Sequence, residues 1–155
     1  MDKEVIHFLN ILEGYKTRCK NLHWAADNIN THEYLDKFLD EISEFQDSIA
    51  EGYLGIKGSL NNDDIRGVLI KADNAFELAF KLRGDLIYFY DGIPDIALYK
   101  GLMSECENFI QVVNKYKYLF GLCNGIEEVS LDDVQIAEFE LDSFSAMFEL
   151  VIGSL

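Results

Sequence analysis

The sequence is poor in proline and in positive charge. It holds one proline among 155 residues, where average usage of about 5% would give roughly eight, so long stretches are free to form helices. Lys and Arg number 13 against 28 Asp and Glu, which gives a net charge of −15. Nucleic-acid binders rely on clustered basic residues that meet phosphates, so direct DNA binding is not expected. The acidic composition instead favours cations, or partners with basic faces.

Long apolar runs and a disulfide framework are also absent. No uninterrupted apolar stretch approaches the roughly 18 residues of a membrane span, and the opening residues MDKEVIHFLN lack the pattern of a signal peptide. The cysteines number three, and this odd count indicates structural thiols in a reducing, cytoplasmic environment. With 49% apolar residues, a chain of this length can bury one substantial core.

Apolar residues recur at the spacing of amphipathic helices in four segments, which we expect to span residues 3–26, 31–54, 65–90 and 95–122. Asn30 or Thr31 is a candidate cap for the second helix, and Gly55 and Gly58 should end it. The third segment contains two glycines and is either one helix or a short helix followed by a longer one. The predicted fold class is therefore all-α, with residues 1–123 in an antiparallel four-helix bundle that has short connections.

Residues 124–155 differ from the rest in composition. They hold eight acidic residues and no Lys or Arg, so they contribute −8 to the net charge. The alternation within residues 138–142 fits a strand, but a three-four spacing of apolar residues favours a fifth helix: Val134, Ala137, Leu141, Phe144, Phe148 and Val151. We expect this acidic C-terminal extension to pack on the bundle or on a neighbouring subunit, or to recruit a protein partner.

The second predicted helix carries the residues that point to chemistry. His32 and Asp36 form one polar pair at i, i+4 spacing, and Asp47 and Glu51 form another. With about 100° of rotation per residue, the four side chains fall within a sector of roughly 100° beside the apolar stripe. Asp36 and Asp47 are nevertheless about 16 Å apart along the axis, at about 1.5 Å per residue. No small ion can touch both within one straight helix.

The two pairs share a midpoint. The midpoint of positions 32 and 51 is 41.5, and so is that of 36 and 47. If the helix packs antiparallel against its own copy about a two-fold axis there, His32 faces the partner's Glu51 and Asp36 faces the partner's Asp47. Such an isologous dimer holds two equivalent sites, each with one imidazole and three carboxylates. This mixture of donors suits a first-row divalent metal, iron above all, and the metal charge offsets the repulsion among the carboxylates.

These residues resemble a known family, the Dps proteins, which are miniferritins also called DNA-binding proteins from starved cells. The family's signature is similar, in order and over about residues 5–58, to Leu22-His23-Trp24, His32-x-x-x-Asp36 and Asp47-x-x-x-Glu51. The resemblance implies a ferritin-like bundle with a ferroxidase centre shared by two subunits: His23, His32 and Asp36 from one, and Asp47 and Glu51 from its two-fold mate. Trp24 matches the aromatic residue beside that centre.

The resemblance also implies an assembly and a function. In that family twelve subunits form a hollow shell in which Fe(II) is oxidised, preferentially by hydrogen peroxide, and stored as a ferric mineral. Removing peroxide and free Fe(II) together protects against oxidative damage. The chain departs from the family's pattern in three respects: the interval from His23 to His32 is a few residues shorter, the lysine-rich tail with which some members bind DNA is missing, and the acidic C-terminal extension has no counterpart.

Simpler interpretations stay open for the same residues. The four polar residues of the second helix also fit a solvated face, or a dimer interface that binds no metal. His23 also fits a cationic residue at the end of the first helix. Cys19, four residues earlier, is a possible ligand, but we expect a buried thiol there. The alternative function is a ferritin-like structural or interaction module with a vestigial metal site, acting through its acidic C-terminal extension.

Overall fold

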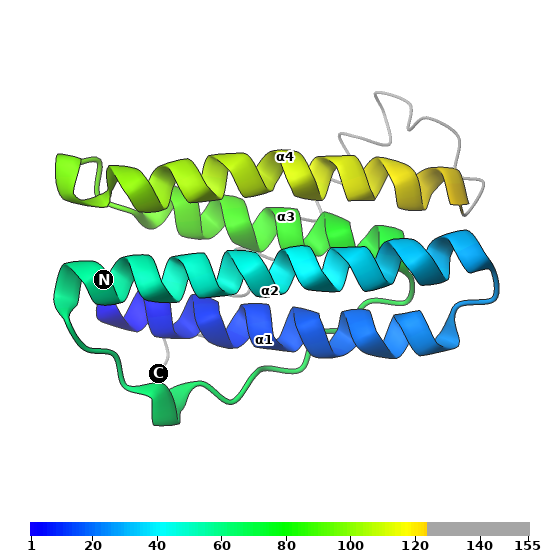
Figure 1. Ribbon diagram of the computed structural model, residues 1–155, viewed down its shortest axis with the longest axis horizontal. Coiled ribbons are helices and arrows are strands. Elements are labelled where there is room, and N and C mark those ends of the chain that lie inside the picture. The colour runs from blue at the N-terminus through cyan, green and yellow to red at the C-terminus, as the bar shows by residue number, and fades with distance from the viewer. Residues whose placement is uncertain (124–155) are drawn as a thin grey trace.

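Four long helices make up the part of the chain that the structure describes. The computed structural model describes residues 1–123, which form α1 (Asp2–Ala25), α2 (Ile29–Lys57), α3 (Ala75–Gly92) and α4 (Lys100–Cys123), with short 3₁₀ turns η1 (Asn62–Asp64) and η2 (Ala97–Tyr99) (Figure 1). These residues contain no strand, so the all-α prediction is confirmed for them. The predicted fifth helix lies outside the described residues.

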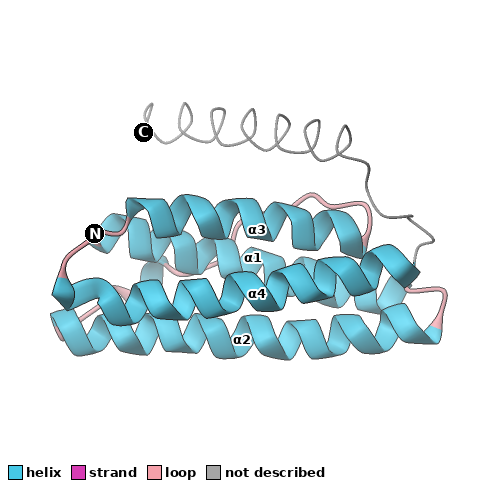
Figure 2. Cartoon of the chain, turned by 90° about the horizontal axis from the view of Figure 1, so that it is seen from above, coloured by secondary structure: helices cyan, strands magenta, loops and turns pink. Residues whose placement is uncertain are grey.

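The four helices form a bundle in which each helix packs against two others. α1 packs against α2 and α3, and α4 packs against α3 and α2. Figure 1 shows that α1 and α4 run in one direction and α2 and α3 in the other, so each of these contacting pairs is antiparallel. Figure 2 shows the same four rods from above, with their axes roughly aligned. None of the four has an apolar stretch long enough to cross a lipid bilayer.

Because α2 and α3 run parallel, the chain crosses the length of the bundle between them. Residues 58–74 form this crossover and run along α1 (Figure 1). The Asn10 amide bonds to three backbone groups of the crossover at 2.7–3.0 Å, and the Arg18 guanidinium donates two bonds to the carbonyl oxygen of Ala72. Between them, Gly14 permits close approach, because a Cβ there would lie 2.1 Å from a crossover carbonyl oxygen. The prediction of short connections is wrong at this point.

The second helix is longer than predicted at both ends. The cap is Asn28, whose side chain accepts a bond from the backbone N–H of Thr31, so the predicted caps Asn30 and Thr31 are wrong. Helix α2 continues through Gly55 and ends at Gly58, where φ is +79°. Glycine tolerates this left-handed conformation and is a common helix terminator.

The third helix begins ten residues later than predicted. Residues 65–74 are not helical: Gly67 has φ of +89°, and backbone groups there bond to side chains of α1 and α3. Asn74 caps α3 by accepting a bond from the N–H of Glu77, and Gly84 does not interrupt the helix. The first helix is confirmed within one residue at each end, whereas the predicted start of the fourth at residue 95 is wrong: it begins at Lys100, after the turn η2.

Aromatic rings connect all four helices through the core. Phe8 of α1 stacks on Phe89 of α3 with ring centroids 4.0 Å apart, and Phe45 of α2 stacks on Phe109 of α4 at the same distance. Phe8 and Phe45 meet edge to face at 6.0 Å. Such pairs add roughly 0.5–1.5 kcal/mol each beyond their burial. These four rings, which we call the aromatic ladder, therefore fix how α2 is rotated in the bundle, and with it the direction in which its polar side faces.

Candidate metal centre

The connection between α1 and α2 brings two predicted ligands together. His23 lies in the last turn of α1 and His32 in the first turn of α2, joined by residues 26–28. The Asn28 cap, whose Oδ1 accepts from the N–H of Thr31 at 2.8 Å, sets where α2 starts. The imidazole rings of His23 and His32 are stacked, with centroids 3.8 Å apart and an interplanar angle of 22°. The short interval between them is therefore no obstacle to their meeting.

Each ring of this histidine pair is held by the backbone of the other residue. Nδ1 of His23 lies 2.7 Å from the carbonyl oxygen of His32, and Nδ1 of His32 lies 2.9 Å from the carbonyl oxygen of His23. A carbonyl oxygen only accepts hydrogen bonds, so each Nδ1 carries the proton and donates it. In the neutral rings the lone pairs are then on the two Nε2 atoms. A backbone carbonyl that fixes the Nδ1–H tautomer in this way is the usual support of a metal-binding histidine.

Asp36 follows His32 by one turn of α2 and is exposed. Its charge reaches the neighbouring Cys19 of α1: burial, with a smaller contribution from Asp36, raises the pKa of the Cys19 thiol to about 12. The thiol donates to the carbonyl oxygen of Leu35 at 3.3 Å and is completely buried. The prediction of a buried thiol at position 19 is confirmed.

The second polar pair lies far from the first. Asp47 and Glu51 are exposed on α2, and the eleven residues from Asp36 to Asp47 correspond to about 16 Å of helix. Within residues 1–123 of one chain, no three His, Cys, Asp or Glu side chains come together as a metal-binding group. The structure thus brings His23 and His32 together, with Asp36 one turn further along α2, and leaves Asp47 and Glu51 apart from them. The predicted site needs a second copy, which a single chain does not contain.

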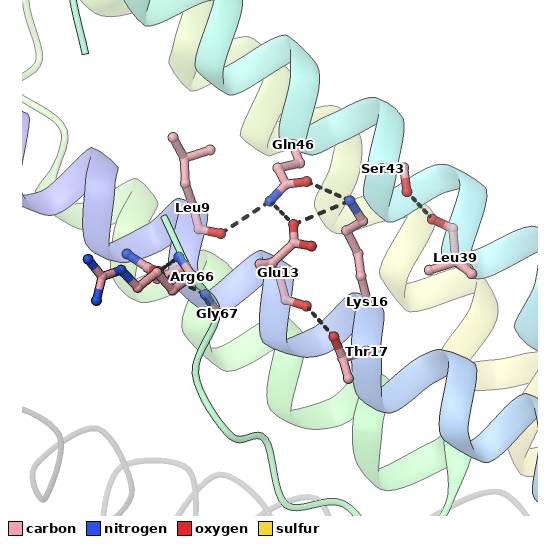
Figure 3. A network of polar contacts seen from close by, with 10 residues as sticks. Leu9, Glu13, Lys16, Thr17, Leu39, Ser43, Gln46, Arg66 and Gly67 are labelled. Carbon is pink, nitrogen blue, oxygen red and sulfur yellow. Dashed lines mark hydrogen bonds and ion pairs between the residues drawn. The ribbon is translucent and has the colours of Figure 1, made fainter. Parts of the chain in front are cut away.

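A buried glutamine fixes α2 next to Asp47. Gln46 is 9% exposed, and its Nε2 donates to the carbonyl oxygen of Leu9 at 3.2 Å and to Glu13 at 2.9 Å. Lys16 closes the network by donating to Gln46 at 2.9 Å and to Glu13 at 3.3 Å, as Figure 3 shows. With Gln46 turned towards α1, the adjacent Asp47 is exposed on the outside. Sequence reasoning missed this residue, although its position beside the stripe residues 45 and 49 was a usable signal.

Two large apolar side chains flank the histidine pair and are exposed. Trp24 follows His23 and is 69% exposed, and Ile29 opens α2 and is 65% exposed. The Lys20 ammonium lies 5.8 Å from the centre of the Trp24 ring.

Comparison of the chain with models of protein families, with curated proteins and with solved structures gives no match.

Proposed function

We propose that two copies of the chain pair through α2 and oxidise Fe(II) at the two sites created between them. Each site combines His23, His32 and Asp36 of one copy with Asp47 and Glu51 of the other. In this proposal the bundle is ferritin-like, the pairs assemble into a larger homo-oligomer, and ferric iron is stored within it. The direction of the helices and the long crossover between α2 and α3 agree with bundles of that kind.

The observation that carries the proposal is the histidine pair. Two stacked rings, each with Nδ1 donating to a backbone carbonyl at 2.7 or 2.9 Å, leave two Nε2 lone pairs available, one turn of α2 before Asp36. Their rotamers are set before any metal arrives, which lowers the entropy lost on binding. A merely solvated helix face has no need of such an arrangement.

The outer side of α2 also suits a two-fold contact. Positions 29 and 54 share the midpoint of the two polar pairs, so Ile29 would meet the partner's Leu54 at each end of the interface. This contact would cover an apolar side chain that is 65% exposed in the single chain. The crossover runs along α1, and Asp36, Asp47 and Glu51 on α2 are exposed, so this side of α2 is accessible to a second copy.

The chemistry needs few protein groups. The carboxylates of Asp36, Asp47 and Glu51 prefer the harder Fe(III), while imidazole binds Fe(II) well, so the donor set promotes oxidation. Two Fe(II) ions give one electron each to hydrogen peroxide, which yields two Fe(III) and two hydroxide ions; oxygen is the other candidate oxidant. The acidic surface raises the local concentration of the cation.

The first experiment measures Fe(II) oxidation by absorbance after peroxide is added. His32→Ala with Asp36→Ala should abolish the fast phase, and Asp47→Ala with Glu51→Ala should do the same. The control, Asp91→Ala with Glu105→Ala, removes two exposed carboxylates from α3 and α4 and should oxidise iron like the wild type. If all three proteins behave alike, the chain is not an iron oxidase at this site.

A mixing experiment tests whether each site is shared. The two inactive double variants are unfolded together and reassembled. In a mixed pair, one site combines both sets of substitutions and the other is intact, so random mixing should restore about a quarter of the wild-type sites. Two inactive variants that stay inactive on mixing, although mass measurement shows that they pair, would rule out a site between copies. A chain that stays monomeric would rule out the whole proposal.

A further inference from the structure

The side of α3 that faces away from the core is unusually apolar for an outer helix. Between Ala75 and Tyr90, only Tyr88 is exposed, at 40%. Phe80, Ile87 and Tyr88 lie on the side opposite the core stripe, by the helical rotation of about 100° per residue. Although α3 also carries charged residues, neighbouring large apolar side chains of this kind are normally covered in a folded protein. Among the described elements α3 packs against α4 and α1, which leaves this third side for another segment.

The adjoining surface is positive, in a chain that is otherwise acidic. Residues 75–84 of α3 and 112–123 of α4 lie side by side, since Arg83 donates to Asn114 at 3.1 Å, and we call this surface the basic face. It has a net charge of +3, from one acidic and four basic residues: Glu77, Lys81, Arg83, Lys115 and Lys117. By contrast, α2 has seven acidic and two basic residues, a net charge of −5.

Two of these cations lie over aromatic rings. Arg83 lies 5.4 Å from the ring centre of Phe80, and Lys117 of α4 lies 5.2 Å from that of Phe76. Lys81 is paired with Glu77 at 2.9 Å, so the single acid of the basic face is already neutralised. The basic face therefore combines half-buried aromatic surface with positive charge, which is complementary to an acidic, amphipathic segment.

The chain itself supplies such a segment. The acidic C-terminal extension starts directly after α4, at the end of the bundle where the basic face lies. It carries −8 and no positive charge, and its apolar residues repeat at three-four spacing. In helical form, 32 residues would span about 48 Å, more than the length of α3. The acidic side of α2 would repel it.

We propose that residues 124–155 dock on the basic face and along the outer side of α3 of their own chain. The apolar stripe would cover Phe80, Ile87 and Tyr88, and the carboxylates would lie near Arg83 and Lys117. This docking is independent of the iron site, because it uses the side of the bundle formed by α3 and leaves α2 open for pairing. It also neutralises part of a charge of −8 that would otherwise oppose close packing of many copies.

Proteolysis of the full chain tests the docking. The segment has no Lys or Arg but contains five glutamates, so a glutamate-specific protease can cut it, and mass spectrometry follows cleavage after Glu138 and Glu140. Arg83→Glu with Lys117→Glu should raise the cleavage rate about tenfold or more. The control, Lys37→Glu with Lys57→Glu on α2, changes the net charge equally and should cleave like the wild type. Circular dichroism verifies that both variants are folded.

A salt series on the wild type gives a second readout that needs no variant. At about 1 M ionic strength the Debye length is about 3 Å, and cleavage should become several times faster than at low salt. Equal cleavage rates in the three proteins, together with no salt effect, would overturn the proposal. Wild-type cleavage that accelerates on dilution would also overturn it, because the segment would then lie on a neighbouring chain.

Discussion

Replacing Asp85 with asparagine should stabilise the protein at neutral pH and have no such effect in acid. Asp85 of α3 is 9% exposed and accepts a hydrogen bond from the hydroxyl of Tyr15 of α1 at 2.5 Å. Burial raises the pKa of Asp85 from 3.8 to about 6, while the Tyr15 bond and the charge of Lys81 act in the opposite direction. The folded chain therefore favours the neutral carboxyl group.

The sign and the size of the effect follow from this pKa. Because the folded state holds the Asp85 proton more tightly than the unfolded chain, its contribution to the free energy of unfolding is fully present below the unfolded pKa of 3.8. The contribution is lost as pH rises through about 6. The difference between 3.8 and about 6 corresponds to about 3 kcal/mol. Asparagine keeps an oxygen for the Tyr15 hydroxyl and carries no charge, so the variant avoids the loss.

Urea unfolding of wild type and Asp85→Asn in parallel, followed by circular dichroism, measures this difference across the acid and neutral range. The other carboxyl groups titrate in both proteins, so their contributions cancel in the comparison. The variant should gain about 3 kcal/mol relative to the wild type between about pH 4 and pH 8. Asp91→Asn, at an exposed position of the same helix, is the control and should show a constant difference. A constant difference for Asp85→Asn as well would refute the argument from burial.

Three further substitutions, one of them paired with a control at Gly101, test the packing that supports the site. Gly14→Ala should lower the free energy of unfolding by about 1–3 kcal/mol, because its Cβ would push the crossover away from α1. The control, Gly101→Ala, has no atom within 4 Å of the new Cβ and should raise the free energy of unfolding by up to about 1 kcal/mol. Equal urea midpoints for the two variants would contradict this contrast. Asn28→Ala removes the cap of α2 and should cost about 1 kcal/mol, with faster amide hydrogen exchange in the first turn of that helix. Phe45→Ala breaks the aromatic ladder and should cost about 3–5 kcal/mol, so a thermal midpoint close to that of the wild type would show that the ladder is dispensable.

Residue spacing in the sequence predicts those features that depend on a single helix, such as which of its sides is buried. The apolar stripes of α1, α2 and α4 are recognisable because each buries one side against its neighbours. The placement of Asp36, Asp47 and Glu51 on the outer side of α2 follows from the same periodicity and is seen in the structure. Their meeting across a two-fold axis stays a prediction.

The crossover was not predictable in this way. Its apolar residues between Ile65 and Ile70 resemble helix by spacing, but the backbone there is fixed by Asn10 and Arg18, more than fifty residues earlier. Such long-range contacts leave no periodic signal. Likewise, the stacking of His23 on His32 depends on the geometry of a three-residue connection, which the interval between the two histidines did not reveal.

The path of the crossover determines which sides of the bundle remain available. The crossover runs along α1 and contacts it at Asn10, Gly14 and Arg18. It therefore covers α1, a helix that carries no proposed metal ligand until His23 in its last turn. The acidic side of α2 and the apolar side of α3 are left to other segments. They differ in charge, −5 along α2 against +3 on the basic face, so the acidic C-terminal extension and a second copy would not compete for one surface. A substitution on the basic face should therefore leave iron oxidation unchanged, and one at His32 should leave proteolysis of the extension unchanged.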